Sequence, residues 1–150
     1  MERETLTTRP PDSALLDSSV VLKWFRRDEV WRDVALQLRL AYIEGRMVIY
    51  VPDLLTYEIA NVLRFKPDLS QGQVQAALNS LYDMQIRIVK GSREVVKEAI
   101  HLAYLYEVTV YDAAFVAIAE NLSVPFITAD DKLSQKLAKA SNVHHISVFA

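Results

Sequence analysis

Four acidic residues of this chain, Asp17, Glu58, Asp112 and Asp130, occupy positions from which their carboxylates could reach one pocket. Carboxylates that are crowded together repel one another and raise each other's pKa. A divalent cation relieves that repulsion, and a ligand set made only of oxygen favours Mg²⁺ or Mn²⁺. Such ions can activate water and stabilise the leaving oxygen of a phosphodiester. The four acids therefore predict metal-dependent hydrolysis of a nucleic-acid backbone.

Two of these acids follow short apolar segments that are typical of buried strands. Asp17 follows residues 14–16, and Asp130 follows residues 124–128. In a parallel sheet, ligands gather beyond the carboxyl ends of the strands, where loops and helix N-termini meet. Each acid also has a simpler explanation as the N-cap of the helix that follows. At the second position Asp131 could be the cap, so the sequence leaves open which acid of the pair faces the site.

Glu58 is the most informative of the four, because its predicted helix is otherwise apolar on that side. On a wheel of 100° per residue it shares its side with Leu54, Leu55, Val62 and Phe65. A carboxylate in the middle of an apolar face is costly unless it is paired or coordinated. The alternatives to a metal ligand are a buried salt bridge or an exposed helix edge.

Asp112 lies in the first turn of an alanine-rich helix, on the side of Phe115, Val116 and Ala119. An acid in the first turn of a helix also complements the helix dipole. Taken alone, Asp112 fits that structural role better than a chemical one. Its value as a candidate comes from the other three acids.

The elements that would position these acids alternate along the chain. Strands are predicted over residues 14–17, 47–51, 86–89, 124–128 and 145–149, and helices over 18–25, 30–44, 53–64, 71–84, 92–106, 111–122 and 131–140. This alternation predicts an α/β fold whose central sheet is mostly parallel and covered by helices on both faces. Residues 1–13 are polar and contain Pro10 and Pro11, so we expect a flexible arm before one domain over residues 14–150.

Composition narrows the class of protein. The chain of 150 residues is 51% hydrophobic and has no cysteine, which excludes disulfides, thiolate zinc sites and thiol nucleophiles. No signal peptide and no apolar run of the ~18 residues that span a bilayer is found, so we expect a cytoplasmic protein without a membrane anchor. The formal net charge of −2 argues against a broad basic face, but it becomes +2 without the four acids. Basic residues that could line an RNA groove are Lys23, Arg26, Arg27, Arg64, Lys66, Lys132, Lys136 and Lys139.

Four short segments carry a resemblance to a known family. They are LDSSV at 16–20, TYEIAN at 56–61, VYDAA at 110–114 and FITAD at 126–130. In this order and spacing the chain resembles PIN-domain nucleases, in particular the VapC-like toxins of prokaryotic toxin–antitoxin pairs, over residues 15–148. The resemblance implies a PIN-like α/β/α sandwich and a ribonuclease that is the toxin of a type II pair.

The same resemblance implies roles for individual residues and partners. Asp17, Glu58, Asp112 and Asp130 would bind Mg²⁺ or Mn²⁺. A surrounding set of hydroxyl, amide and acidic groups, which here would be Ser18, Asn61, Thr128 and Asp131, would orient them. The expected partners are an RNA substrate, a cognate antitoxin that blocks the site, and a second copy of the chain. Residues 30–40 and 74–82 are the candidate dimer contacts.

Two other functions remain as alternatives. A phosphatase of the haloacid dehalogenase type also has an aspartate after its first strand, but it requires a second aspartate two residues later. Ser19 occupies that position here, which argues against this class. A PIN-like module that has lost catalysis and only binds a protein partner is the other alternative. The complete set of acids argues against it, and a metal-dependent cleavage assay separates the two.

Overall fold

The computed structural model describes residues 9–150, so the first eight residues of the predicted arm lie outside the described range. Its strands are β1 (Ser13–Leu16), β2 (Val48–Pro52), β3 (Arg87–Val89), β4 (Phe126–Thr128) and β5 (Val143–His145). Its helices are α1 (Ser18–Val21), α2 (Arg32–Ile43), α3 (Leu54–Arg64), α4 (Gln71–Asp83), α5 (Arg93–Tyr106), α6 (Val110–Leu122) and α7 (Asp131–Lys136), with two 3₁₀ turns, η1 (Leu22–Trp24) and η2 (Ile146–Phe149).

The five strands form one sheet in the order β3-β2-β1-β4-β5, and every pairing is parallel. The chain moves outward from β1 to β2 and β3, and then returns to the other side of β1 with β4 and β5. The strand order therefore reverses between β1 and β4, and open α/β sheets bind ligands beyond the carboxyl ends of the strands at such a point. Asp17 directly follows β1, and Asp130 is the second residue after β4.

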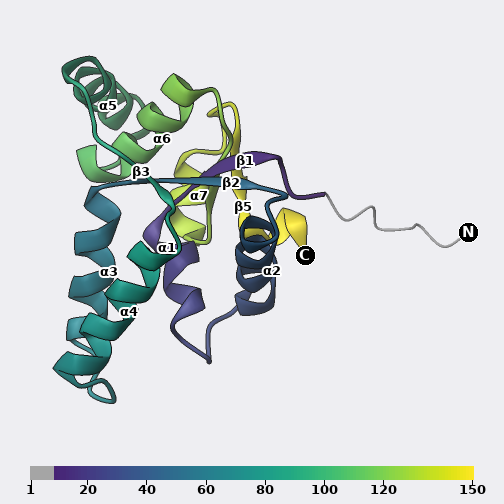
Figure 1. The fold of residues 1–150 in the computed structure, drawn as a ribbon. Helices are drawn as coiled ribbons and strands as arrows, with labels where there is room; N and C mark the ends of the chain where they lie inside the picture. The colour runs from purple at the N-terminus through teal and green to yellow at the C-terminus, as the bar shows by residue number, and fades with distance from the viewer. Residues whose placement is uncertain (1–8) are drawn as a thin grey trace, which may run out of the picture.

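Helices cover both faces of the sheet, which confirms the predicted sandwich. In Figure 1, α5 and α6 lie above the strands, and α1 to α4 lie below them. The central strands are fully enclosed, with Leu15, Leu16, Phe126 and Ile127 all at 0% exposure. Within residues 9–150, no single helix is long and apolar enough to cross a bilayer; only α5 and α6 taken together pass that test, and they are bent by 118°.

The predicted strand over residues 145–149 is wrong. The last strand ends at His145, and the chain then turns into η2. The imidazole of His145 accepts the backbone N–H of Ser147 at 3.2 Å, which starts that turn. Ile146 and Phe149 are both buried, at the spacing of three that brings side chains onto one side of a 3₁₀ helix. The apolar residues that were predicted to form a strand are therefore buried by one turn of 3₁₀ helix.

Two helices also differ from expectation. Helix α7 ends at Lys136 instead of residue 140, because the following backbone bonds (Ala138 N–H to Gln135, Ala140 N–H to Leu137) have the spacing of turns. On α3, the buried face is formed by Leu55, Ile59 and Leu63, whereas Phe65 is 69% exposed. Glu58 is half-buried and lies at the border of this face, so its predicted place in the middle of an apolar face is wrong.

Candidate active site

Asp17 is the buried centre of the site, because it joins β1, α1 and β4. Its Oδ1 accepts the Val20 N–H at 3.3 Å and the Ser19 hydroxyl, so the acid does cap α1. Its Oδ2 accepts the Thr128 hydroxyl at the end of β4. The residue is 5% exposed, and burial raises its pKa from 3.8 to about 6 although these hydrogen bonds act to lower it. The carboxylate is therefore held in a place where its own negative charge is costly.

Ser19 is a site residue that the sequence did not reveal, since position 19 served only to reject the phosphatase class. Its hydroxyl donates to Asp17 and accepts the backbone N–H of Ala129 at 2.8 Å. This one side chain thus fixes the carboxylate and joins the first turn of α1 to the loop after β4. A hydroxyl two residues after a strand-end acid is the signal that could have indicated it.

Glu58 faces Asp17 from α3 and has only one hydrogen-bond partner. Its Oε2 accepts the Ser18 hydroxyl at 3.3 Å, whereas its Oε1 is buried without any partner among the described residues. Burial raises the pKa of Glu58, and the charges of Asp17 and Asp112 raise it further, against the bond from Ser18. No cation among residues 9–150 pairs with it, so the alternative of a buried salt bridge is wrong.

Asp112 enters from the first turn of α6, and Thr109 provides the cap of that helix. The Thr109 hydroxyl oxygen accepts the Asp112 N–H at 3.0 Å, which orients the first turn. Burial raises the pKa of Asp112; the charge of Asp130 adds to this, whereas the Thr109 hydroxyl and the Lys136 ammonium oppose it. Thr109 is a second positioning residue that the sequence analysis missed, although a threonine before an apolar helix is a common N-cap.

The structure distinguishes the two adjacent acids after β4. Asp130 is the cap of α7, since its Oδ1 accepts the Leu133 N–H at 3.0 Å, and its own N–H donates to Thr128 at 3.1 Å. Asp131 instead contacts His145, with 2.8 Å between Oδ1 and Nε2. The option in which Asp131 caps the helix is therefore wrong. The charge of Asp130, by contrast, contributes to the raised pKa values of Asp17 and Asp112.

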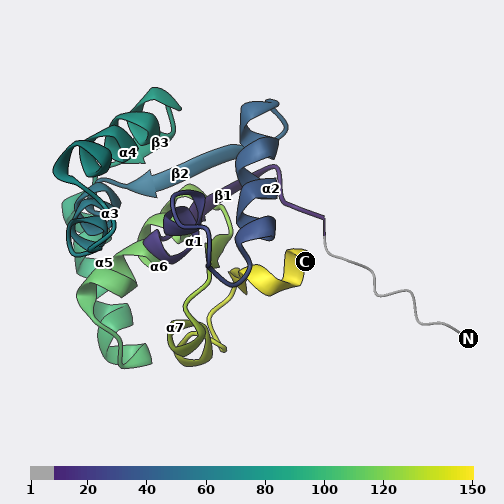
Figure 2. The same cartoon turned by 90° about the horizontal axis from the view of Figure 1, so that it is seen from below.

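The residues predicted to surround the acids divide into two groups. Ser18 and Thr128 donate hydrogen bonds to Glu58 and Asp17. Asn61 is exposed and makes no side-chain hydrogen bond in the described part of the chain, and Asp131 is directed to His145. In Figure 2, α3 and α7 lie on different sides of α1, and α6 overlaps α1 in this view but lies across the sheet from it in Figure 1.

The four acids fit a divalent cation by chemistry, although they do not form a finished cage. Within residues 9–150 no three His, Asp or Glu side chains are close enough to hold one ion as they stand. The carboxylates nevertheless raise one another's pKa, and all available donors are oxygens. The buried Oε1 of Glu58, which has no partner, is the kind of atom that a bound cation would satisfy.

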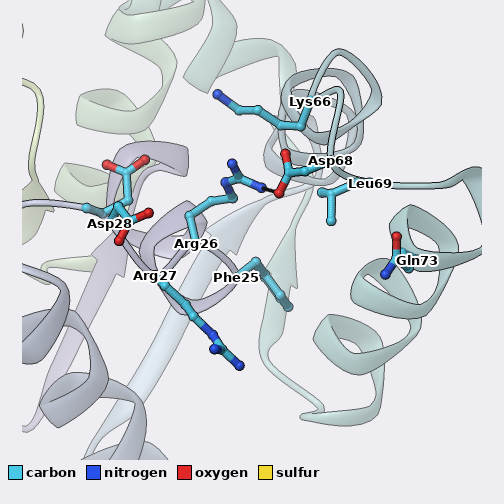
Figure 3. Close-up of a pocket in the computed structure, with 9 residues that line it drawn as sticks. Phe25, Arg26, Arg27, Asp28, Lys66, Asp68, Leu69 and Gln73 are labelled. Carbon is cyan, nitrogen blue, oxygen red and sulfur yellow. Dashed lines mark hydrogen bonds and ion pairs between the residues drawn. The ribbon is translucent and has the colours of Figure 1, made fainter.

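The basic residues predicted to line an RNA groove are not equally available. Lys23 is buried and pairs with Glu29 at 3.3 Å, and Arg26 pairs with Asp68 at 2.9 Å. Figure 3 shows Arg26 and Asp68 joined within a pocket of about 570 Å³ that also contains Arg27 and Lys66. The residues that line this pocket include none of the four acids.

The chain is similar in sequence to known proteins. A model of the PIN domain family matches residues 14–139. Ribonuclease VapC3 of Pyrobaculum aerophilum is 35% identical over 92 residues, which cover 59% of this chain and 70% of that protein.

Solved structures with low sequence identity share the fold. A toxin–antitoxin complex from Klebsiella pneumoniae matches with a TM-score of 0.66 at 18% identity, over 89% of this chain and 97% of that chain. VapC20 of Mycobacterium tuberculosis, a sarcin–ricin loop cleaving toxin, matches with a TM-score of 0.63 at 12% identity, over 81% of this chain and 93% of that chain.

Proposed function

Because this chain belongs to the PIN-domain family, we propose that it is a metal-dependent ribonuclease and the toxin of a type II toxin–antitoxin pair. The observation that supports the proposal is the effect of these acids on one another: the charges of Asp17 and Asp112 raise the pKa of Glu58, and the charge of Asp130 raises the pKa of Asp17 and of Asp112. The name of the related ribonuclease supports RNA as the substrate, and the toxin–antitoxin structures support a protein partner.

Asp17, Glu58, Asp112 and Asp130 would hold Mg²⁺ or Mn²⁺. When bound there, such an ion supplies an activated water and neutralises charge that develops on the phosphodiester. The protein's own contribution is to hold the carboxylates in place. Ser19 and Thr128 fix both oxygens of Asp17, and Ser18 holds one oxygen of Glu58 while the other stays free. Because these groups are prepared before binding, little reorganisation is needed at the time of reaction.

Cleavage of RNA by the purified chain tests this function. We expect cleavage with Mg²⁺ or Mn²⁺ and its loss in EDTA. Asp112→Asn is expected to reduce the rate by two or more orders of magnitude, whereas Asp83→Asn, which changes an exposed acid at the end of α4, leaves it unchanged. Added cognate antitoxin is expected to suppress the cleavage. A chain that binds antitoxin but cuts no RNA with either metal would instead be the catalytically inactive binding module.

We also propose a homodimer, and we place the protein in the cytoplasm with its RNA substrate. Large apolar side chains are exposed on both predicted contact segments, at Leu40 and Tyr82. Helix α5 exposes a further row, Val96, Ile100 and Tyr104, at the spacing of one helical face. Light scattering at micromolar concentration is expected to give the mass of two chains, and a monomer mass would refute this assembly.

A further inference from the structure

An RNA chain at the acids requires cations beside them, because phosphate contacts provide much of the affinity of a protein for nucleic acid. The basic residues of this chain differ in whether a carboxylate already neutralises them. Lys23 and Arg26 each form an ion pair, with Glu29 and Asp68. The pocket of Figure 3 contains as many acidic side chains as basic ones. The lining of that pocket therefore carries no net charge, and it includes none of the four acids.

A second pocket, of about 350 Å³, lies directly beside the acids between α6 and α7. Lys132 and Lys136 line it together with three acids, Glu107, Asp112 and Asp130. The two lysines are four residues apart on α7, so they project from the same side of that helix. No carboxylate pairs with either lysine among residues 9–150.

Lys136 is held in place without losing its charge. Its ammonium donates to the backbone carbonyl of Glu107 at 3.0 Å, and Glu107 ends α5 in a left-handed conformation. A carbonyl is neutral, so the bond orients the ammonium and leaves its positive charge in the pocket. That charge reaches the acids, since it lowers the pKa of Asp112 against the raising effect of burial. A purely structural role, capping the C-terminus of α5, would need the bond to Glu107 but no charge in the pocket.

We infer that Lys132 and Lys136 form a phosphate-binding subsite, which takes the backbone phosphate next to the one that is cut. The inference rests on the proposed ribonuclease function. It adds a path for the RNA chain, which would run from the acids between α6 and α7 and not through the pocket of Figure 3. A cation held by Asp112 and Asp130 would offset the charge of these two acids, and the two lysines would then outweigh Glu107 where the second phosphate lies.

The salt dependence of RNA binding tests this subsite. The probe is a fluorescent single-stranded RNA of about 12 nucleotides, within the ~4–16 that single-strand binding folds cover. Its affinity for the full chain is measured by anisotropy over a series of KCl concentrations, in EDTA to prevent metal-dependent cleavage. Loss of one phosphate contact is expected to reduce the slope of log K against log salt by about 0.7.

Three variants separate charge from structure. The double variant, which combines Lys132→Ala with Lys136→Ala, is expected to lower the slope of log K against log salt and to weaken RNA binding several-fold. Lys136→Gln retains a donor for Glu107, so it should keep the thermal stability of the wild type and still weaken binding. Lys97→Ala, an exposed lysine on α5, is the matched control and should change neither the slope nor the affinity.

The outcomes distinguish this inference from the proposed function. A wild-type chain that neither binds nor cuts RNA refutes the function itself. If the wild type cuts RNA and the double variant shows the same slope of log K against log salt as the wild type, only the subsite is refuted. A hexaglutamate peptide provides a further test. If binding of this peptide depends on the two lysines and binding of RNA does not, the lysines bind an acidic protein segment and the inference is overturned.

Discussion

Glu58→Gln is expected to reduce RNA cleavage by orders of magnitude without reducing the stability of the metal-free protein. The amide keeps the shape of the side chain and an acceptor for Ser18, but it removes the charge that would hold a divalent cation. The carboxylate is already disfavoured by burial and by Asp17 and Asp112, so its neutral replacement should leave the free energy of unfolding level or raise it. Urea melts in EDTA and cleavage rates per folded molecule measure the two effects.

A matched control for this substitution is Asp83→Asn, which removes an exposed acid from the end of α4 and should change neither quantity. If Glu58 were half of an ion pair, its loss would cost ~3–5 kcal/mol of stability. A loss of that size with unchanged cleavage per folded molecule would show that Glu58 is structural and that the acids are not a metal centre.

Asp17 is expected to make the metal-free protein less stable as the pH rises from about 4 to 7. Its pKa is about 6 in the folded chain against an ordinary 3.8, so between these values the folded state keeps a proton that the unfolded state has lost. Stability falls with pH wherever the folded state binds more protons. Each pKa unit corresponds to ~1.4 kcal/mol, so the full loss in the free energy of unfolding is about 3 kcal/mol. This loss is present above pH 7 and absent below pH 4.

Asp17→Asn tests this directly, because an amide carries no charge and still accepts a hydrogen bond from Ser19 or Thr128. In EDTA the variant should equal the wild type near pH 4 and exceed it by up to about 3 kcal/mol near pH 7.5. Added Mn²⁺ should then stabilise the wild type more than the variant. Asp83→Asn supplies the control for a surface acid. A stability difference between wild type and Asp17→Asn that does not vary with pH would contradict the raised pKa.

The two explanations considered for the strand-end acids proved compatible. Asp17 and Asp130 each use one oxygen to cap a helix, as local rules predict, and Asp17 uses the other to bind Thr128. When the acid that caps a helix directly follows a strand, its carboxylate already lies beside the end of the neighbouring strand. For this reason the capping role does not exclude these two residues from the candidate site, and their role in metal binding stays a prediction.

Local sequence by itself determined most elements, and it selected the four acids, whose role in binding a metal stays a prediction. Apolar segments, helix caps and Gly45 at the end of α2 act over a few residues, so their patterns are visible in the chain. It failed at residues 145–149, where a short apolar pattern suits a strand and a 3₁₀ turn equally well. The sequence pattern also placed Glu58 in the middle of an apolar face, whereas it lies at the border of that face. Periodicity does not indicate which part of an apolar side the core covers.

Only the tertiary structure decided which distant groups meet. Thr128 binds Asp17 across 111 residues, Ser18 binds Glu58 across 40, and Asp131 is drawn to His145. The contact between Thr128 and Asp17 depends on β4 pairing beside β1, and strand order is not encoded in a local period. The same holds for the cations: whether a lysine or arginine is free to meet a phosphate depends on the carboxylate that the fold places beside it. Arg26 is neutralised by Asp68 from the α3–α4 loop, whereas Lys136 is held by a neutral carbonyl and keeps its charge.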